Sequence, residues 1–461
     1  MSLYAVSDKS DPQEAQSACA PTQAILQRLL LFGLCGLLIF AVLAFGAVEE
    51  WSTFAFETGA AALFLVWAAL QLRSEEVELS KNPLYLPSLL FFILILAQIV
   101  LRRTAYAYVT KHEALQYVSY GIVMLVAAEC AREADTRRKF TVVMIVFGAL
   151  YAFFALAQDL TPNGKIFWLR QPRFGGGFYG SYVNHDHYAG LMEMLAPIPL
   201  VLGMGRILNG GQRALVAFSG VLMASTIFLS RSRGGMFAFV VELLVFSALV
   251  SGRKRNLRPV LGAIALCVLI LAFLVFVGKG QVLGRFGELS PGMRLNMTRD
   301  SLRMFVEHPV WGYGLGTFPT VYPSRRSFYT NLFVNAAHND YAQLLVEGGL
   351  LGFGLMLWFL IRLYKNGVPT SRRWEFEWNE ALSLAALLGC TGMLLHSFVD
   401  FNLQIPANAA FFYVLCALAA SGPSSQPFTG TGNSETHRSP DAVLSQRRFE
   451  RSDERVEFDE I

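Results

Sequence analysis

Residues 29–48 read LLLFGLCGLLIFAVLAFGAV, a run of twenty residues that contains no charged side chain. An α-helix needs about 20 such residues to cross the hydrocarbon core of a bilayer. Similar apolar runs follow at residues 54–72, 84–101, 115–130, 140–156, 187–205, 214–229, 236–250, 260–277, 341–361, 381–395 and 407–420. The sequence therefore predicts an all-α polytopic membrane protein with about twelve transmembrane helices.

The composition of the chain agrees with this prediction. Of the 461 residues, 54% are hydrophobic and only 16% are charged, whereas soluble proteins carry about 25% charged residues. The net charge of +4 is too small to indicate a nucleic-acid-binding protein. The six cysteines follow neither a disulfide framework nor the spacing of a metal-thiolate site. We expect membrane lipid, and no nucleic acid, among the partners.

The charges between the apolar runs predict the orientation. With the N-terminus in the cytoplasm, that side receives the basic loops 132–139, 206–213, 253–258 and 362–373, which is the pattern of the positive-inside rule. The opposite side receives two short turns without Lys or Arg, 49–52 and 396–406. We therefore predict a cytosolic N-terminal tail (1–27), a membrane domain (28–421) and a disordered cytosolic tail (422–461) too poor in apolar residues to bury a core.

The longest predicted external segment covers residues 278–340, between the ninth and tenth spans. Ser290 has the character of an N-cap, Pro291 suits the first helical position, and the His308-Pro309 pair ends a helix. A helix over residues 291–307 is expected, with Arg294, Arg299 and Arg303 on its surface. The glycine-rich stretch 311–317 (WGYGLGT) follows a helix and not a strand, which argues against a dinucleotide-binding loop.

A short turn between two apolar runs, residues 230–235 (SRSRGG), holds Arg231 and Arg233 at the predicted outer surface. The arginine side chain suits bidentate binding of phosphate, and the headgroup of a lipid-linked diphosphate would lie at this depth. Two interpretations stay open. The arginines bind such a diphosphate, or they only extend to ordinary lipid headgroups.

His338, Asn339 and Asp340 open the tenth span at its predicted outer end. Histidine is the side chain that removes a proton near neutral pH, which a hydroxyl acceptor would require. The alternative is a histidine that only caps or packs against the start of a helix.

Asn184, His185, Asp186 and His187 open the sixth span. Residues two apart on a helix do not share a face, and the sequence offers no further ligand cluster, so we expect no metal. A capping and hydrogen-bonding role is expected instead. Carboxylates inside spans are costly, and two occur here, Glu193 and Glu242. Each is expected either to pair with an arginine across helices or to contact a substrate.

These motifs together resemble those of the O-antigen ligase and polymerase superfamily of bacterial membrane glycosyltransferases. The resemblance covers roughly residues 45–420 and is densest over residues 180–352. It rests on His338-Asn339 with GLLG at 349–352, on Arg294 with HPVWGYGLGTFP at 308–319, on Ser232-Arg233-Gly234, on residues 184–189, and on HSFVDFN at 396–402. The chain departs from the pattern at Asp186, where many relatives carry asparagine.

The resemblance implies a multi-pass enzyme of the bacterial cytoplasmic (inner) membrane whose active site faces the periplasm or the cell exterior. It would transfer a glycan from an undecaprenyl-diphosphate carrier to a hydroxyl of an acceptor glycolipid or glycan in surface polysaccharide or lipopolysaccharide biosynthesis, without a cofactor or a metal. Arg233 and Arg294 would hold the diphosphate, with Arg231 as the alternative to Arg233. His338 would activate or position the acceptor, supported by Asn339, Asn184, Asp400 and Glu193.

Three other functions stay open at this point. A polymerase of the same superfamily uses the same donor but adds the glycan to another lipid-linked repeat, whereas a ligase adds it to lipid A core or another surface molecule. A secondary transporter would have broken helices and charged residues along a path at the membrane midplane. Most charged candidates here gather near the predicted outer surface, which favours glycan transfer over transport. A structural membrane scaffold is the third alternative.

Overall fold

The computed structural model describes residues 12–73, 79–172, 177–204, 207–254, 291–330, 333–368 and 378–421. In these residues the secondary structure is helical, without strands, and includes two isolated β-bridges. The chain divides into two units, Met1–Pro423 and Ser424–Ile461. The predicted span 260–277, residues 278–290 of the predicted external loop and the predicted C-terminal tail (422–461) lie outside the described residues, as do residues 1–11 of the predicted N-terminal tail.

The described helices follow one another through the first unit. In chain order they are α1 (Pro12–Leu43), η1 (Phe45–Ala47), α2 (Glu50–Gln71), α3 (Tyr85–Val100), α4 (Ala107–Cys130), α5 (Ala134–Leu160), α6 (His185–Leu195), α7 (Pro197–Met204), α8 (Gly210–Leu229), α9 (Arg233–Lys254), α12 (Pro291–Glu307), α13 (Phe318–Val321), η2 (Tyr322–Ser324), α14 (Asp340–Gly367), α15 (Trp378–His396), η3 (Asn402–Gln404) and α16 (Pro406–Ala420).

The predicted helices agree closely with those observed. Each apolar run in the described residues falls on a helix, and α12 has the bounds predicted for the external helix. The run 187–205 differs, because it forms two helices, α6 and α7. Pro197 and Pro199 lack the backbone N–H that a continuous helix would need here. Helix α1 starts at Pro12, well before the apolar run, so part of the predicted N-terminal tail is helical.

Six described helices are long and apolar enough to cross a membrane: α1 from Ile25, α2, α5, α8, α14 and α15. Two further apolar helices, α3 and α16, are shorter. These helices support a membrane protein, as the composition predicted. The larger number of about twelve spans stays a prediction.

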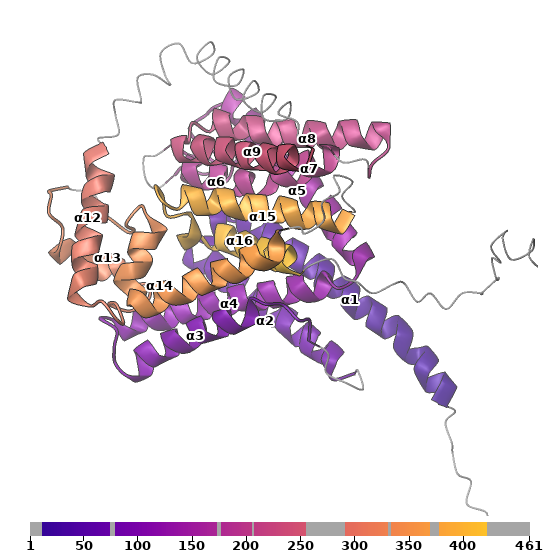
Figure 1. Cartoon of the computed structure of the whole chain (residues 1–461), viewed down its shortest axis with the longest axis horizontal. Helices are drawn as coiled ribbons and strands as arrows, with labels where there is room; N and C mark the ends of the chain where they lie inside the picture. The colour runs from indigo at the N-terminus through magenta and orange to yellow at the C-terminus, as the bar shows by residue number, and fades with distance from the viewer. Residues whose placement is uncertain are drawn as a thin grey trace, which may run out of the picture. The chain divides into compact units, whose positions relative to one another are not determined.

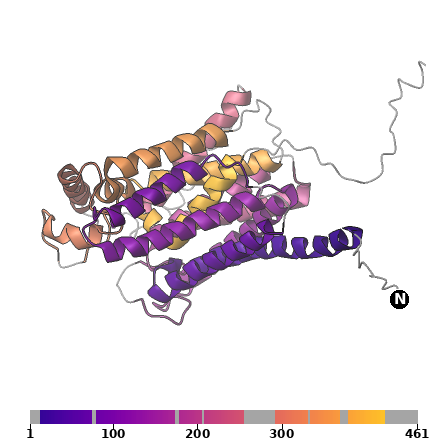
Figure 2. The ribbon, with the colours of Figure 1, turned by 90° about the horizontal axis from the view of Figure 1, so that it is seen from below.

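Within the first unit the long helices lie side by side as a bundle (Figures 1 and 2). Helices α15 and α16 pack against each other, and most of their residues are buried, so they form the centre of the bundle. Helix α15 contacts α6, α7 and α9, while α16 contacts α4 and α14, and α14 contacts α3. Figure 1 accordingly shows α8 and α9 on one side of this central pair and α3 and α4 on the other.

Helix α14 is interrupted at Gly349, whose φ of 60° and ψ of −161° are accessible essentially to glycine alone. An interruption leaves backbone groups without helical partners, and those groups must be satisfied. The chain before α13 does so: the amides of residues 350 and 351 donate to the carbonyls of 309 and 310, and the amides of 313 and 314 donate to the carbonyls of 346 and 347. The segment 309–314 thus fills the break in α14.

Gln98 of α3 fastens the same segment from the other side. Its amide nitrogen donates to the carbonyls of Trp311, at 2.7 Å, and Glu347, at 2.9 Å, and its oxygen accepts from the amide of Leu315, at 3.2 Å. The Gln98 side chain is fully buried, so these bonds are shielded from competition by water. They connect the end of α12 to both α3 and α14, and so hold α12 against the bundle.

Candidate functional site

Most of the predicted site residues lie on or near the turn between α15 and α16, residues 397–405, which meets the first residues of α6, α9 and α14 and the start of α12. Two of them cap helices. The side-chain oxygen of Asn184 accepts from the amide of Asp186 at 2.9 Å at the start of α6, and that of Asn339 accepts from the amide of Ala342 at 3.0 Å at the start of α14. Such caps satisfy amides that have no partner within the helix. The two asparagines thereby fix the helix ends that carry their neighbours.

His338 and Asp400 form a hydrogen-bonded pair. The Nδ1 atom of His338 lies 3.1 Å from Oδ1 of Asp400, and the carboxylate is fully buried whereas the imidazole is 23% exposed. The ring of Phe401 packs edge-on against the imidazole, with centroids 4.7 Å apart. Because an ionised carboxylate only accepts hydrogen bonds, Nδ1 carries the hydrogen. Nε2 of the neutral ring is then the nitrogen that can accept a proton.

Asp340 fixes the start of α14 to the same turn. Its carboxylate accepts from the hydroxyl of Ser397 at 2.8 Å and from the amide of Leu403 at 3.2 Å, and its own amide donates to the carbonyl of Ser397 at 2.9 Å. These bonds join segments that are far apart in sequence. They keep His338 beside Asp400 without relying on the single bond between the two side chains.

Arg294 of α12 contacts the same turn. Its Nη1 atom donates to the carbonyl of Val399 at 2.6 Å, and Nη2 lies 3.4 Å from Oδ2 of Asp186. A guanidinium has five donors, so these two contacts leave capacity for an anion. Arg294 therefore contacts the residue that precedes Asp400 in the turn, and its contact with Asp186 fixes its orientation.

The start of α9 packs against the turn as well. A Cβ atom on Gly234 would lie 2.6 Å from the His396 ring and 2.9 Å from a methyl group of Val399, so the absence of a side chain permits this close approach. Arg233, half-buried, precedes Gly234 as the first residue of α9. The structure thus brings the segments of Arg233 and Arg294 together at Val399.

Arg231 lies in a different environment from Arg233. It is exposed, with a left-handed backbone at a φ of 66°. Burial raises the pKa of the Tyr179 hydroxyl, the charge of Asp159 raises it further, and the charge of Arg231 lowers it. Arg231 is therefore near Tyr179 and Asp159. This favours Arg233 over Arg231 as the arginine adjoining His338 and Asp400.

Glu193 has a partner that the sequence did not suggest. Its Oε1 atom lies 3.0 Å from Nδ1 of His396, and both side chains are buried. We expected an arginine or a substrate, but the structure supplies a histidine from α15. The oxygens of Glu242, also buried, have no hydrogen-bond partner among the described residues. The Cβ atom of any residue at position 392 would lie 1.4 Å from Oε1 of Glu242, so Gly392 makes room for this carboxylate.

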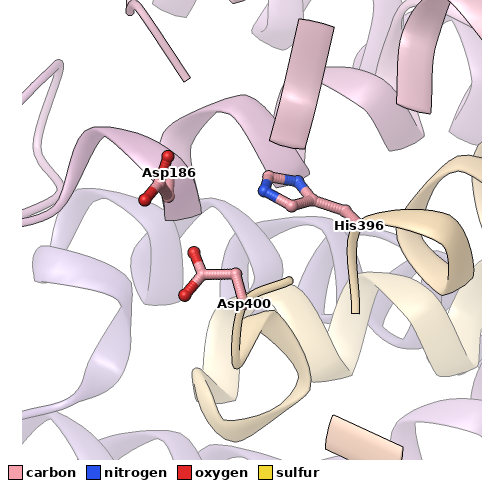
Figure 3. A group of neighbouring side chains, drawn as sticks. All are labelled: Asp186, His396 and Asp400. Carbon is pink, nitrogen blue, oxygen red and sulfur yellow. The ribbon is translucent and has the colours of Figure 1, made fainter. Parts of the chain in front are cut away.

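Asp186, His396 and Asp400 form a group that could hold a metal ion, with one ligand atom of each within 4.8 Å of the others. Figure 3 shows the three side chains pointing toward one another. The sequence does not reveal this group, because its members come from two segments about 200 residues apart, which no spacing rule connects. A positive charge already faces it, since Arg294 contacts Asp186. The negative charge of this group can therefore also hold an arginine side chain in place.

The Asp400 carboxyl has a pKa below its ordinary value of 3.8. Burial acts to raise this pKa, but the hydrogen bond from His338 and the charges of His187 and His396 outweigh burial and lower it. A carboxylate whose pKa is lower in the folded than in the unfolded protein stabilises the folded state at pH values above the pKa of the unfolded state. This stabilisation is lost as the pH falls through the pKa of the folded state. Asp400 should therefore stay charged throughout the range in which histidines titrate.

We expect Asp400 to stay ionised as the pH is lowered from 8 to 5. Infrared difference spectra of the purified wild-type protein over this range should therefore contain no protonated-carboxyl band that is absent from the spectra of Asp400→Asn. The reason is that the pKa of Asp400 lies below the ordinary value of 3.8, which is itself below this pH range. A band that appears within this range in the wild-type protein, and is missing from Asp400→Asn, would contradict the charged state of the His338 partner.

Residues 218–357 match the family model described as O-Antigen ligase. The match contains Arg231, Arg233, Arg294, His338 and Asn339, and it ends before the α15–α16 turn. No curated protein matches the chain. The family match confirms the part of the resemblance that falls within it: between residues 218 and 357, this chain carries the sequence pattern of the O-antigen ligase superfamily.

Proposed function

We propose that this protein transfers a glycan from a polyprenyl-diphosphate carrier, with undecaprenyl as the expected polyprenyl, to an acceptor hydroxyl. The observation that carries the proposal is the pair of His338 and a buried Asp400, 3.1 Å apart, on the turn that Arg294 also contacts. Such a pair suits removal of a proton from a hydroxyl. Arginines suit a diphosphate, and the family match makes a lipid-linked glycan the expected source of that diphosphate.

The proposed step is a single displacement at the sugar carbon attached to the diphosphate. The acceptor oxygen forms a bond to this carbon, and the bond from the carbon to the diphosphate oxygen breaks with its electron pair on the leaving diphosphate. Nε2 of His338 takes the proton of the acceptor hydroxyl. Asp400 holds the imidazole through Nδ1 and stabilises the positive charge that the ring gains.

The leaving diphosphate gains negative charge as the bond breaks, and fixed donors that face such charge lower the barrier. Arg294 is held in place before the reaction by Asp186 and the Val399 carbonyl, and Arg233 starts the helix that packs on the same turn. We therefore assign the donor diphosphate to Arg233 and Arg294. In this proposal the arginines take the role of a metal ion, and the group Asp186, His396 and Asp400 supports them.

We propose a ligase of the bacterial inner membrane, acting toward the periplasm or cell exterior on lipopolysaccharide or another surface polysaccharide. A repeat-unit polymerase of the same superfamily is the second candidate. Two features bear against a transporter. The break in α14 is filled by residues 309–314, and the buried Glu193 is bonded to His396, so neither feature lines a path for a solute.

The experiment that tests this proposal compares the surface polysaccharides and lipid-linked glycans of a host lacking the gene, with and without the wild-type chain. Long glycan that accumulates on the polyprenyl carrier and is missing from its acceptor indicates a ligase. Single repeats in place of long chains indicate a polymerase. An unchanged profile in the host that lacks the gene would contradict glycan transfer.

A further inference from the structure

Arg137, the fourth residue of α5, is a buried arginine that the proposed reaction does not use. It is only 2% exposed, and it lies on the face of α5 that packs into the bundle, in line with the buried Thr141, Met144 and Gly148. Neither Nε nor Nη1 of its guanidinium has a hydrogen-bond partner among the described residues. A guanidinium stays charged in proteins and only donates hydrogen bonds, so Arg137 brings a positive charge and two unused donor atoms into the interior.

The carboxylates close to Arg137 in the sequence have other partners. Asp135 pairs with Lys139 at 2.5 Å, and Glu129 pairs with Arg132 at 3.3 Å. In the part of the chain that the structure describes, no carboxylate forms an ion pair with Arg137 itself. Burial of an unpaired charge is strongly unfavourable. The folded protein therefore calls for an anion beside this guanidinium.

Arg137 lies at the end of the bundle away from the α15–α16 turn. Its neighbour Arg138 places the guanidinium carbon 5.2 Å from the centroid of the Trp378 ring, and Trp378 is the first residue of α15. Helix α15 runs from there to His396, a length of about 27 Å at a rise of about 1.5 Å per residue. Side chains on a helix lean toward its N-terminus, so the guanidinium of Arg137 lies close to this end. The distribution of basic loops predicts that this end faces the cytoplasm.

Two helices, α5 and α15, start at this end, and their starts add donors for an anion. The first amides of a helix have no partner within it, and a helix N-terminus carries a partial positive charge. No side chain caps the start of α5 through a hydrogen bond. The indole nitrogen of Trp378 is also buried without a hydrogen-bond partner among the described residues. Arginine donors and helix N-termini together are the groups that bind phosphate oxygens in proteins.

We propose that Arg137 binds a phosphate group where the starts of α5 and α15 meet. The phosphate oxygens accept charged hydrogen bonds from the guanidinium, and the negative charge compensates its burial. The phosphate of an anionic phospholipid and free inorganic phosphate share this chemistry. Basic sites between membrane helices on the cytoplasmic side bind anionic lipid headgroups, so a phospholipid is the expected source. The site lies at the other end of the bundle from His338 and Asp400, and the inference does not depend on glycan transfer.

Native mass spectrometry of the delipidated full-length protein in detergent measures this binding directly. The wild type should bind one dioleoylphosphatidylglycerol about tenfold or more tightly than Arg137→Met does, because hydrogen bonds to a charged group are lost. Dioleoylphosphatidylcholine, whose phosphate is balanced by its own choline, should bind the two proteins equally. Arg132→Met is the matched control, since it removes an exposed guanidinium from the same loop. This control should bind phosphatidylglycerol as the wild type does.

Thermal unfolding in detergent distinguishes the two sources of phosphate and detects a folding defect. Without lipid or phosphate, Arg137→Met should unfold at a temperature no lower than that of the wild type, because the variant buries no unpaired charge. Phosphatidylglycerol should raise the unfolding temperature of the wild type and of Arg132→Met, but not that of Arg137→Met. The same pattern with inorganic phosphate, compared with chloride at equal ionic strength, and not with the lipid, would make free phosphate the ligand.

Two outcomes would overturn the inference. Equal binding of phosphatidylglycerol by the wild type and Arg137→Met, together with equal responses to inorganic phosphate, would mean that Arg137 binds no phosphate group. An unfolding temperature of Arg137→Met below that of the wild type, in the absence of both ligands, would mean that Arg137 has a partner within the chain. Asn379 of α15 is the candidate for that partner, because its side-chain oxygen is also buried without a hydrogen-bond partner among the described residues.

Discussion

His338→Ala is expected to lower glycan transfer by about 100- to 10,000-fold, the range of general base catalysis, with binding of the polyprenyl-diphosphate donor retained. The reason is that the imidazole faces the acceptor hydroxyl in the proposed step, whereas the arginines hold the donor. Single-turnover transfer and donor binding should be measured on the same nanodisc preparation. His112→Ala is the matched control, because His112 is an exposed histidine of α4 outside the site.

Substitution of Asp400 gives a second test of this prediction, because Asp400 acts through His338. Asp400→Asn alone should reduce transfer, since an amide no longer stabilises the positive charge on the imidazole. Residues that act as a unit have non-additive effects, so His338→Ala with Asp400→Asn should be no slower than His338→Ala alone. A multiplicative loss in the double variant would assign Asp400 a role independent of His338. Loss of donor binding in His338→Ala would refute the acceptor-base role.

Arg294→Ala should lower turnover by about 100-fold or more, as removal of a single preorganised donor does in other enzymes, and Arg233→Ala should act similarly. Arg294→Lys should recover only part of the activity, because an ammonium cannot make two parallel bonds to a phosphate. The measurement is the initial rate of transfer, together with the unfolding temperature as a check that the variants are folded.

The control for these variants lies on the same helix. Arg303 is 65% exposed and pairs with Asp300 three residues earlier, so Arg303→Ala removes a charge from α12 without touching the α15–α16 turn. It should keep near-normal turnover, because the Arg303 side chain is mostly exposed and the buried Asp300 keeps its hydrogen bonds from Ser327. Near-normal transfer by Arg294→Ala or Arg233→Ala would remove that arginine from the donor site. A similar loss in Arg303→Ala would indicate a general effect of charge on the external segment.

Periodicity and hydropathy identified most of the helices because those signals are local. The external helix 291–307 followed from a proline at its start and a His-Pro pair at its end, and both act within a few residues. The division of 187–205 into α6 and α7 could also have been predicted, since Pro197 and Pro199 stand in the sequence. The start of α1 at Pro12 could not, because the residues before the apolar run carry no strong helical signal.

The candidate site divides in the same way. His338, Arg233 and Arg294 were recognised as isolated chemical groups at the ends of helices, and the motif resemblance joined them. The pairing of Glu193 with His396 and the grouping of Asp186 with Asp400 depend on how helices pack across the bundle. No spacing in the sequence records such contacts. Only the packing shows that a buried glutamate meets a histidine and not an arginine.

The filled break in α14 also sets an order of assembly. The amides of residues 313 and 314 are synthesised before the carbonyls of 346 and 347 that accept from them, and the Gln98 side chain is made long before either. A nascent chain that has not yet completed α14 can therefore hold this segment only through earlier residues such as Gln98, and the packing of α12 against α14 has not formed. Arg294 takes its place only once the last helices are inserted. In the proposed mechanism an unfinished chain therefore lacks part of the donor site, and the newly made protein would act only once its last helices are in place.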